Sequence, residues 1–427
     1  MVKNESSVNS HHPPIMIANA PLVMQEKVPW SSHGYYLSER PLFTLDPLLH
    51  AGIYYVQEAS SMFLEVALKQ TVDLSKPLRI LDLCAAPGGK STLIQSLISK
   101  NSILVSNEVI KTRVNILIEN ITKWGAANVV VTNNDPKDFS RLENYFDVIV
   151  VDAPCSGSGL FRKEPEAINE WSEENVKLCS QRQQRIIADV WPSLKQNGIL
   201  IYSTCSYSKE ENEDILDWME TRFEVAGLRL KVENKWNVVE TDSGQDGFGY
   251  RFYPDKLKGE GLFIAAVQKK SGGNFSFPKT KKANFEKLTK NQEIVVKNAI
   301  IDSGETSFFK KEDLIYSLPA DLLEDFIFLR QLLYIKKAGI LLGKIIHHEL
   351  IPHHELALSN RIDPDTNSVE LTKDLSLNYL RREEIHIETN LKGWCLVTYQ
   401  SHNLGWIKIL PNRVNNYYPL QWKIRMI

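Results

Sequence analysis

The sequence is poor in cysteine: it has five in 427 residues, and none of them forms a CxxC pair. A small, odd number of scattered thiols argues against a disulfide scaffold and a zinc ribbon, and it fits a reducing compartment. Long apolar runs are missing too, because none reaches the roughly 18 residues of a membrane-spanning helix. The polar start of the chain makes a poor signal peptide. We therefore expect a cytoplasmic protein without a membrane partner.

An excess of either charge is also missing: 50 Lys and Arg residues stand against 52 Asp and Glu residues, which gives a net charge of −2. Any basic surface for nucleic acid must therefore be local. A hydrophobic share of 43% and a charged share of 24% exclude a disordered, collagen-like or coiled-coil chain. At roughly 100–200 residues per domain, the length predicts two to four domains.

Apolar, β-branched runs alternate with helical patterns from Leu78 onward. This alternation predicts a doubly wound α/β domain around a parallel sheet. The expected strands are 78–84, 103–108, 128–135, 147–154 and 198–205, with 262–268 closing the sheet. The expected helices are 58–69, one starting at Lys90, 111–124 and 173–195.

Changes in composition divide the chain into four expected segments. Residues 269–291 carry seven lysines and one glutamate, which is typical of a linker or a domain edge. The segments are a short N-terminal extension and lead-in (1–75), the α/β domain (76–270), a basic linker and intermediate region (271–330) and a C-terminal domain (331–427).

A turn of small residues, LDLCAAPGGKS (81–91), joins the first expected strand to a helix. It is not a Walker A loop, because Cys84 stands where that loop has its first glycine, and GxGxxG is absent. Its small side chains let a ligand approach the backbone and the N–H groups at the start of the helix. Taken alone, the turn fits a tight connection without a ligand equally well.

Two acidic residues favour a ligand at this turn. Glu108 ends the second expected strand, where a carboxylate can accept hydrogen bonds from ribose hydroxyls. Asp135 ends the third, where an acceptor could take the amino group of adenine. A ligand with ribose and adenine but no pyrophosphate is S-adenosylmethionine, which we expect as the cofactor.

Two cysteines follow neighbouring expected strands: Cys155 in VDAPCSGSG and Cys205 in YSTCSY. Adjacent strands lie about 4.8 Å apart, so both thiols would emerge at the carboxyl edge of the sheet, with Asp152 beside them. Free cysteines are more often small buried hydrophobes, which is our interpretation of Cys179 and Cys395. A redox pair is the other alternative, although a reducing compartment disfavours a standing disulfide.

A pair of thiols suits methylation of cytosine. Carbon 5 of cytosine is too weak a nucleophile to take a methyl group directly. A thiolate that adds to carbon 6 converts carbon 5 into an enamine carbon, which splits one difficult step into easier ones. A carboxyl group at the ring N3 would stabilise the adduct. The C5 proton must then leave, and the thiol must be eliminated.

Five motifs resemble, in their order, those of the Nop/Sun family of RNA cytosine-C5 methyltransferases, including its members that act on small-subunit rRNA: LDLCAAPGGKS, NNDP, VDAPCSGSGLFRKEPEA, YSTCSY and RFYPDKLKGEGLF. The resemblance runs from about residue 28 to residue 427. It implies a Rossmann-like S-adenosylmethionine-dependent methyltransferase domain. The cofactor contacts that it implies are Cys84, Ala85, Ala86, Pro87, Gly88, Gly89, Lys90, Glu108, Asp135 and Asp152.

The same resemblance assigns the catalytic roles. It implies that Cys205 is the nucleophile, that Cys155 assists release of the product, and that Lys90 and Asp152 lie near the target base. DNA cytosine methylases use the thiol of a Pro-Cys dipeptide, so Cys155 is the alternative nucleophile.

The C-terminal stretches 334–344, 350–359 and 404–424 resemble the family's PUA-like α+β RNA-binding module. Residues 391–427 hold five Lys or Arg residues and no acid, interleaved with aromatic residues, which suits unpaired RNA. The alternative is a small β-barrel core with a basic surface. No cysteine or carboxylate pattern completes a metal site with the histidines nearby, so we expect a solvated loop and no metal at His347, His348, His353 and His354.

The leading hypothesis is an S-adenosylmethionine-dependent methyltransferase for a cytosine C5 in 16S rRNA, acting as a monomer. The alternatives are a tRNA or DNA cytosine-C5 methyltransferase and a non-catalytic rRNA-binding assembly factor. The region before residues 28–37 is shorter than is usual in the family. We therefore expect RNA affinity to come mainly from the basic linker and from residues 391–427.

Overall fold

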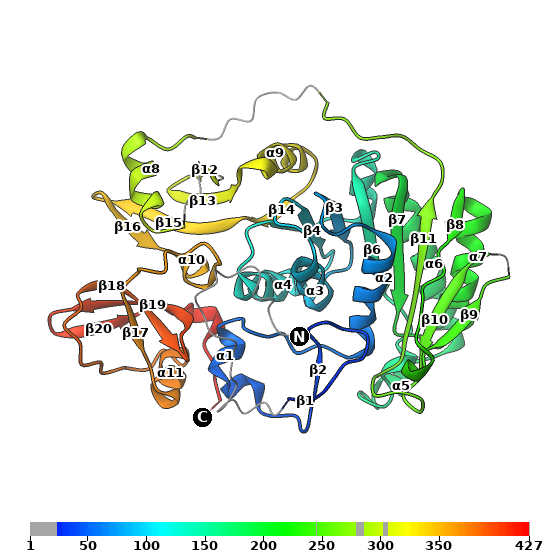
Figure 1. Ribbon diagram of the computed structural model, residues 1–427, viewed down its shortest axis with the longest axis horizontal. Helices are drawn as coiled ribbons and strands as arrows, with labels where there is room; N and C mark the ends of the chain where they lie inside the picture. Colours follow the sequence, from blue (N-terminus) through cyan, green and yellow to red (C-terminus); the bar gives the residue numbers. More distant parts are fainter. Residues whose placement is uncertain (1–23, 245, 279–285, 302–305, 427) are drawn as a thin grey trace.

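The computed structural model describes residues 24–244, 246–278, 286–301 and 306–426. The first 23 residues of the expected N-terminal extension and residues 279–285 of the expected linker lie outside the described residues. A large α/β unit occupies the centre and right of Figure 1, and two small sheets lie to its left. In the described part of the chain, no helix is long and apolar enough to cross a membrane.

The core of the protein is a ten-stranded sheet with five adjacent parallel strands, in the order β5-β4-β3-β6-β7. The chain order reverses between β3 and β6, and ligands of such sheets bind outside the carboxyl ends of the strands at this switch point. The predicted doubly wound α/β domain is confirmed. The parallel strands are β3 (Arg79–Asp82), β4 (Ile103–Asn107), β5 (Val129–Thr132), β6 (Phe146–Asp152) and β7 (Leu194–Thr204).

Antiparallel strands extend the sheet beyond β7. β11 (Leu262–Lys269) pairs with β7, but the prediction that it closes the sheet is wrong. β10 (Phe248–Phe252) pairs with the other edge of β11. Two alternate aromatic side chains of β10, those of Tyr250 and Phe252, are buried. The remaining strands are β9 (Val239–Asp242), which pairs with β10, and β8 (Val225–Gly227), which pairs with β11.

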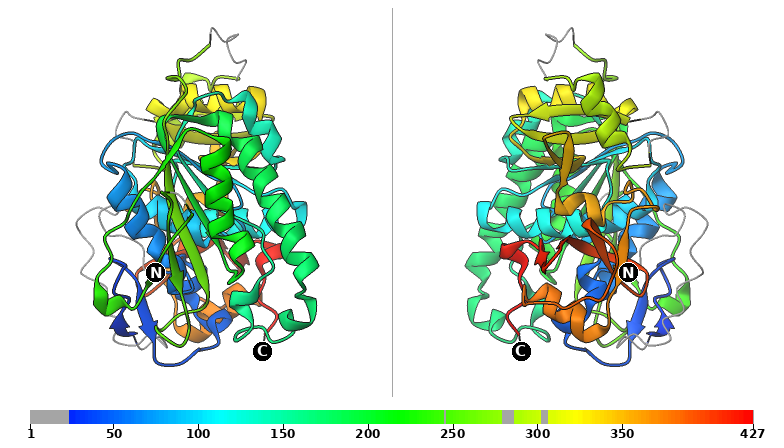
Figure 2. Two further views of the ribbon diagram at one scale, coloured as in Figure 1. Left: turned by 90° about the vertical axis from the view of Figure 1, so that its right-hand side faces the viewer. Right: turned by 90° about the vertical axis from the view of Figure 1, so that its left-hand side faces the viewer.

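Helices cover both faces of the sheet, as the side views show (Figure 2). The predicted helix at 173–195 is too long: it ends at Val190, the segment with Pro192 forms a 3-10 turn, and β7 begins at Leu194. Proline lacks the N–H that an α-helix needs there. One face carries α2 (Leu64–Thr71), α3 (Gly89–Leu97) and α4 (Lys111–Trp124); the other carries α6 (Glu173–Val190), α7 (Glu213–Arg222) and α9 (Leu323–Leu332).

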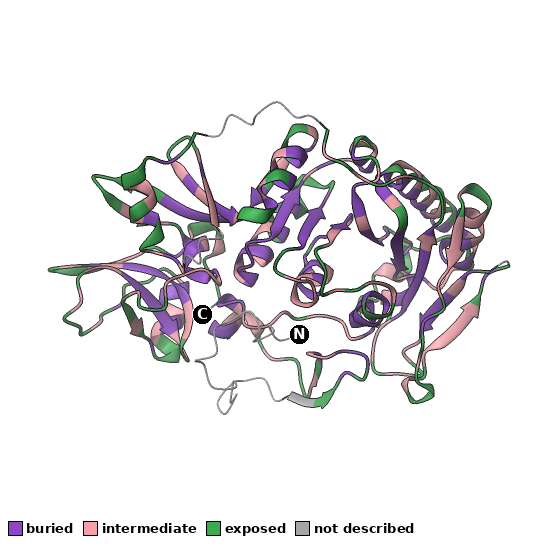
Figure 3. Ribbon diagram, turned by 45° about the horizontal axis from the view of Figure 1, so that its top comes forward, coloured by how far each residue is buried: buried purple, intermediate pink, exposed green. Residues whose placement is uncertain are grey.

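The lead-in segment packs on the sheet. Trp30 is buried, and its ring centroid lies 5.5 Å from that of Phe252 and 6.5 Å from that of Phe63. The lead-in segment is therefore part of the hydrophobic core. Figure 3 shows that the strands of the large sheet and the inner faces of its helices are also predominantly buried. The elements of the lead-in segment are β1 (Met24–Lys27), β2 (Tyr35–Leu37), α1 (Pro47–His50) and the 3-10 turn Ser60–Phe63 that precedes α2.

The next segments form a small sheet and add one strand to the large sheet. β14 (Ile335–Ala338) pairs antiparallel with β5, so a strand from the expected C-terminal domain forms the edge of the central sheet. The small sheet has the order β12-β13-β15-β16. Its elements and neighbours are α8 (Lys290–Lys297), β12 (Thr306–Lys311), β13 (Leu314–Pro319), β15 (Ile340–Ile346), β16 (Glu349–Pro352) and α10 (His354–Leu358).

The last sheet has the order β17-β18-β19-β20 and packs against α11. One face of it, with Cys395 and Ile407, is buried against this helix. These elements are β17 (Ser368–Glu370), α11 (Lys373–Leu380), β18 (Gly393–Tyr399), β19 (His402–Leu410) and β20 (Arg413–Asn416).

An arginine fastens the start of the basic linker to the central domain. Arg79 of β3 forms an ion pair of 2.5 Å with Asp325 of α9. Its guanidinium carbon also lies 4.9–5.0 Å from the ring centroids of Tyr145, Phe275 and Phe277. Cation–π contacts of this kind stabilise by about 0.5–2 kcal/mol each. Phe275 and Phe277 therefore hold this part of the linker against the domain.

A buried histidine connects the lead-in segment to the last sheet. Nε2 of His50 lies 2.9 Å from the carbonyl oxygen of Thr44, and Nδ1 lies 3.5 Å from the hydroxyl of Tyr418. Burial lowers the pKa of His50 from 6.5 to about 4. The folded protein thus holds this imidazole neutral at a pH where the unfolded chain would bind a proton.

We expect this junction to be sensitive to acid. Between pH 6.5 and 4 the unfolded chain binds the His50 proton and the folded chain does not, so stability falls as the pH falls, by up to about 3 kcal/mol. His50→Gln keeps a donor for Thr44 but does not titrate, so its unfolding free energy should fall less over this range. Denaturant unfolding at several pH values measures the difference. The exposed His347→Gln is the control; equal slopes for the two variants would contradict the expectation.

Candidate active site

The turn of small residues at 81–91 follows β3, as predicted, and lies at the switch point of the sheet. Gly88 precedes α3 with φ of +121°, a backbone conformation that strains any residue with a Cβ. At Gly89, an added Cβ would lie 3.1 Å from the ring of Tyr55. Both positions therefore favour glycine, and no side chain at either position covers the backbone at the start of α3.

An asparagine that the sequence analysis missed ties the strand ends together. The amide nitrogen of Asn107 donates to the carbonyl oxygens of Leu83 (3.1 Å) and Asn134 (3.0 Å). Its amide oxygen accepts from Thr132 Oγ1 (2.8 Å) and from the Asn134 N–H (3.0 Å). Four hydrogen bonds from one buried side chain fix the ends of β3, β4 and β5 relative to one another. A polar residue directly after the buried run at 103–106 was the available signal.

A buried carboxyl group lies beneath the turn. Asp82 Oδ2 accepts a hydrogen bond of 2.6 Å from Ser91 Oγ. Oδ1 has no hydrogen-bond partner among the described residues. Burial raises the pKa of Asp82 to about 7, against the opposing effects of the Ser91 hydroxyl and the Lys90 ammonium. An orphaned acceptor at this position points to a donor on a bound ligand.

Glu108 lies at the end of β4, as predicted, and is 3% exposed. Its Oε1 accepts from the Ile110 N–H (2.8 Å), and its Oε2 lies 3.4 Å from Nη1 of Arg113. Arg113 also donates to the carbonyl oxygen of Ala86 (2.6 Å), which joins the acidic residue to the turn. Glu108 is thus held in place with part of its acceptor capacity left for a ligand.

The third parallel strand is shorter than predicted and ends before Asp135. β5 ends at Thr132, because the following asparagines turn away from the strand direction to bond with other loops. Asp135 instead caps a 3-10 turn, where its Oδ1 accepts from the Lys137 N–H (3.1 Å). It remains half-buried at the same edge of the sheet as Glu108.

Lys90 and Asp152 form an ion pair of 2.8 Å between α3 and the end of β6. The other oxygen of Asp152 accepts from Ser203 Oγ (2.8 Å), a partner that the sequence analysis missed. Burial lowers the pKa of Lys90, but the carboxylates of Asp152 and Asp82 outweigh burial and raise it above its usual value; the nearby Cys205 acts in the same direction. A charged ammonium therefore lies close to the second cysteine.

The two predicted cysteines meet at the sheet edge. β6 and β7 are parallel neighbours, with Asp152 opposite Ser203, and the sulfur atoms of Cys155 and Cys205 are 3.0 Å apart. Both thiols are free. The hydrogen bond to Cys205, together with burial, raises the pKa of Cys155 well above its usual value. Cys84 lies in the turn, and Cys179 and Cys395 are buried, Cys395 in the core of the last sheet.

The four C-terminal histidines do not share one environment. His347 and His348 are exposed in a turn, as predicted, but His354 is buried at the start of α10, so the expectation of a solvated loop is wrong for it. Its ring packs edge-on against Tyr418 and Trp422. Among the described residues, no group of three or more His, Cys, Asp or Glu side chains is placed to hold a metal ion.

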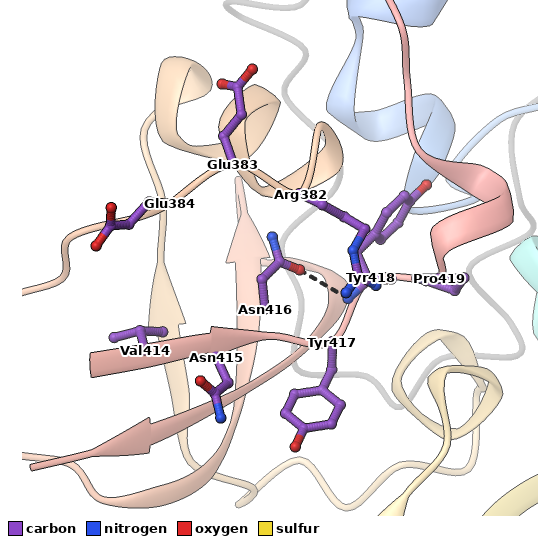
Figure 4. Close-up of a pocket in the computed structure, with 9 residues that line it drawn as sticks. All are labelled: Arg382, Glu383, Glu384, Val414, Asn415, Asn416, Tyr417, Tyr418 and Pro419. Atoms are coloured by element: carbon purple, nitrogen blue, oxygen red, sulfur yellow. Dashed lines mark hydrogen bonds between the residues drawn. The ribbon is translucent and has the colours of Figure 1, made fainter. Parts of the chain in front are cut away.

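The aromatic residues of 391–427 divide between core and surface. Tyr418 is fully buried, whereas Tyr417 is 42% exposed and packs against Trp394, with ring centroids 4.4 Å apart. The Lys408 ammonium lies 5.1 Å from the Trp394 ring. Next to β20 there is an open hollow of about 580 Å³ (Figure 4). It is lined by Arg382, Glu383, Glu384, Val414, Asn415, Asn416, Tyr417, Tyr418 and Pro419.

The sheet order, the open turn at its switch point and the acidic residue after β4 define a Rossmann-like methyltransferase domain. Comparison with protein families agrees. Residues 69–268 match the model of the 16S rRNA methyltransferase RsmB/F, residues 366–424 the PUA domain of methyltransferase RsmF, and residues 8–59 the N-terminal domain of 16S rRNA methyltransferase RsmF.

The chain belongs to the RsmB/F family of methyltransferases. It is 30% identical over 408 residues to the ribosomal RNA small subunit methyltransferase F of Shewanella piezotolerans, a match that covers 92% of this chain and 84% of that relative. The corresponding protein of Shewanella woodyi is 31% identical over 415 residues, with the same coverage of each chain. The predicted family membership and the C-terminal PUA domain are thus confirmed.

Solved structures resemble more than half of the chain. The crystal structure of PH0851 is 26% identical, with a TM-score of 0.52 over 61% of this chain and 58% of that one. A methyltransferase homologue from Pyrococcus horikoshii is 31% identical, with a TM-score of 0.49 over 58% of this chain and 79% of that one.

Proposed function

We propose that this methyltransferase transfers a methyl group from S-adenosylmethionine to carbon 5 of a cytosine in 16S rRNA, with Cys205 as the nucleophile and Cys155 assisting release. The observation that carries the proposal is the pair of thiols 3.0 Å apart at the sheet edge onto which the bare turn opens. A thiol that adds to carbon 6 makes carbon 5 of cytosine nucleophilic, and a second group beside that thiol can assist its release. The family match and the names of the relatives support ribosomal RNA as the substrate.

The residues around the turn fit the proposed cofactor. The backbone from Cys84 to Lys90 would lie along it, because Gly88 and Gly89 leave that path free of side chains. Glu108 would accept hydrogen bonds from the ribose hydroxyls, and Asp135 would lie near the adenine. The unpartnered oxygen of Asp82 supplies a further acceptor. When bound, S-adenosylmethionine supplies an electrophilic methyl group.

The side chains at the edge can divide the chemistry of the base among them. Cys205, with the Lys90 ammonium close by, would add to carbon 6 of cytosine through its sulfur. Asp152, held by Lys90 and Ser203, would interact with N3 of the ring as electron density moves onto it. After methyl transfer, a water molecule takes the C5 proton, and the electrons of that C–H bond form the C5=C6 double bond. The Cys205–C6 bond breaks as this double bond forms, and Cys205 leaves as a thiolate, with Cys155 as the neighbouring group that assists.

The C-terminal PUA domain supports an RNA substrate independently of the thiols. Tyr417 presents an exposed ring next to Trp394 and Lys408, and residues 391–427 carry cations but no acid. Stacking of an unpaired base on an exposed aromatic ring is worth about 1–3 kcal/mol. This surface would bind RNA while the thiols act on the target base.

Cys205→Ala should abolish methylation, because the route through the enamine is lost without a nucleophile, while cofactor binding survives. Release of tritium from [5-³H]cytosine in 16S rRNA measures methyl transfer to carbon 5, and calorimetry measures cofactor binding. Unmodified tRNA and DNA with the same label serve as competing substrates. If Cys205→Ala retains turnover and Cys155→Ala does not, the two roles are reversed; release from tRNA or DNA alone would contradict the proposed substrate.

Cys155→Ala should stall the enzyme after methyl transfer, because Cys205 remains bonded to the methylated base. A protein–RNA adduct that is stable in SDS should accumulate, and it should disappear in the double variant with Cys205→Ala. Gel electrophoresis with labelled rRNA detects the adduct. Normal turnover without an adduct would show that Cys155 is only structural.

Glu108→Ala should weaken binding of S-adenosylmethionine by about 1–3 kcal/mol, because buried ribose hydroxyls and Arg113 lose their acceptor. Isothermal titration calorimetry gives the affinity. Glu119→Ala, which removes an acid of α4 that pairs with Lys123 instead, is the matched control. Equal affinities for the two variants would contradict the placement of the ribose at Glu108.

A further inference from the structure

A single buried carboxylate lies between the two cysteine loops. Glu211 is fully buried and is the last residue of the 3-10 turn Lys209–Glu211 that follows the Cys205 loop. Its Oε2 accepts hydrogen bonds of 2.5 Å from the hydroxyls of both Ser156 and Ser206. Its Oε1 accepts from the Ser156 N–H (2.8 Å) and from Nε2 of Gln183 (3.2 Å). The two serines directly follow the two cysteines in the chain, so this one side chain joins both loops.

The Cys205 loop has anchors that do not involve this carboxylate. Thr204 Oγ1 donates to Oδ1 of Asn212 (2.6 Å), and Nδ2 of Asn212 donates to the carbonyl oxygen of Ser206 (2.8 Å). Thr204 also pairs with Phe263 of β11. The position of Cys205 is therefore fixed by the sheet and by Asn212.

The Cys155 loop depends more heavily on Glu211. Both the N–H and the hydroxyl of Ser156, the residue after Cys155, have Glu211 as their acceptor. Gln183 donates to the carbonyl oxygen of Pro154 and also to Glu211, and longer contacts of 3.2 and 3.4 Å join the hydroxyls of Ser156 and Ser158 to that of Ser206. Removal of the carboxylate would therefore leave the Ser156 N–H without its acceptor, and the Ser156 hydroxyl and the Gln183 amide would each lose one of their two partners.

We propose that Glu211 is a positioning residue that holds Cys155 against Cys205 and thereby sets the rate of product release. The proposal rests on the roles proposed above for the two cysteines. Without the carboxylate, the Cys155 loop moves away while Cys205 keeps its place on β7. Methyl transfer then proceeds, and the covalent adduct persists.

The test compares methyl transfer in a single turnover with steady-state turnover. With enzyme in excess over rRNA, Glu211→Ala should transfer the methyl group at close to the wild-type rate. In steady state its turnover should fall by about 100-fold, the cost of a misplaced reacting group, with an adduct stable in SDS. Glu211→Gln keeps an acceptor for Ser156 and should restore most of the turnover. The exposed neighbouring residue provides the control, Glu210→Ala, which should resemble the wild type.

The double variant Cys155→Ala/Glu211→Ala distinguishes positioning from a general effect on folding. If Glu211 acts through Cys155, the double variant accumulates adduct to the same extent as Cys155→Ala. If Glu211→Ala instead lowers single-turnover transfer as much as steady-state turnover and traps no adduct, the proposal is overturned. An adduct missing from Cys155→Ala itself would mark a failure of the proposed function rather than of this role. Should Glu211→Ala not fold, Ser156→Ala removes one of the same hydrogen bonds and should trap a smaller amount of adduct.

Discussion

The parallel pairing of β6 with β7 is the constraint on which the site depends. Their register sets Asp152 opposite Ser203, so the loops that follow begin side by side. Cys155 and Cys205 follow this pair closely in the chain and therefore lie near each other. Hydrogen bonds between the two loops hold them together. Lys90 reaches the same edge from α3 because β3 is the next strand of the sheet. Strand order thus brings three separated parts of the chain to one edge, and hydrogen bonds between the loops complete the arrangement.

More acidic than cationic side chains gather at the turn. Asp82, Glu108 and Asp152 line the turn, and Lys90 and Arg113 are their cationic partners. The raised pKa of Asp82 reflects burial without a full set of donors. A ligand that brings positive charge and hydrogen-bond donors would relieve this imbalance, and the proposed cofactor, with a sulfonium and an ammonium group, brings both.

Local patterns in the sequence predict much of the fold. Buried β-branched runs predicted the five parallel strands, and the loops after them predicted the meeting of Cys155 and Cys205. The roles of Asn107 and Glu211 could not be predicted, because a polar residue near the end of a run gives no sign of the distant loops that it will join. β14 could not be predicted for the same reason: the pairing of Ile335 with Thr132 depends on tertiary packing rather than on any local period.

β14 has a consequence for how the protein is made. An unpaired edge strand exposes a row of N–H and C=O groups that invites pairing with other chains. On a ribosome, β5 emerges long before β14, so the nascent central sheet presents that edge until most of the polypeptide has been synthesised. The Rossmann-like sheet can therefore cover this edge with its own chain only after residues 335–338 have been synthesised, and until then β5 is open to pairing with other chains.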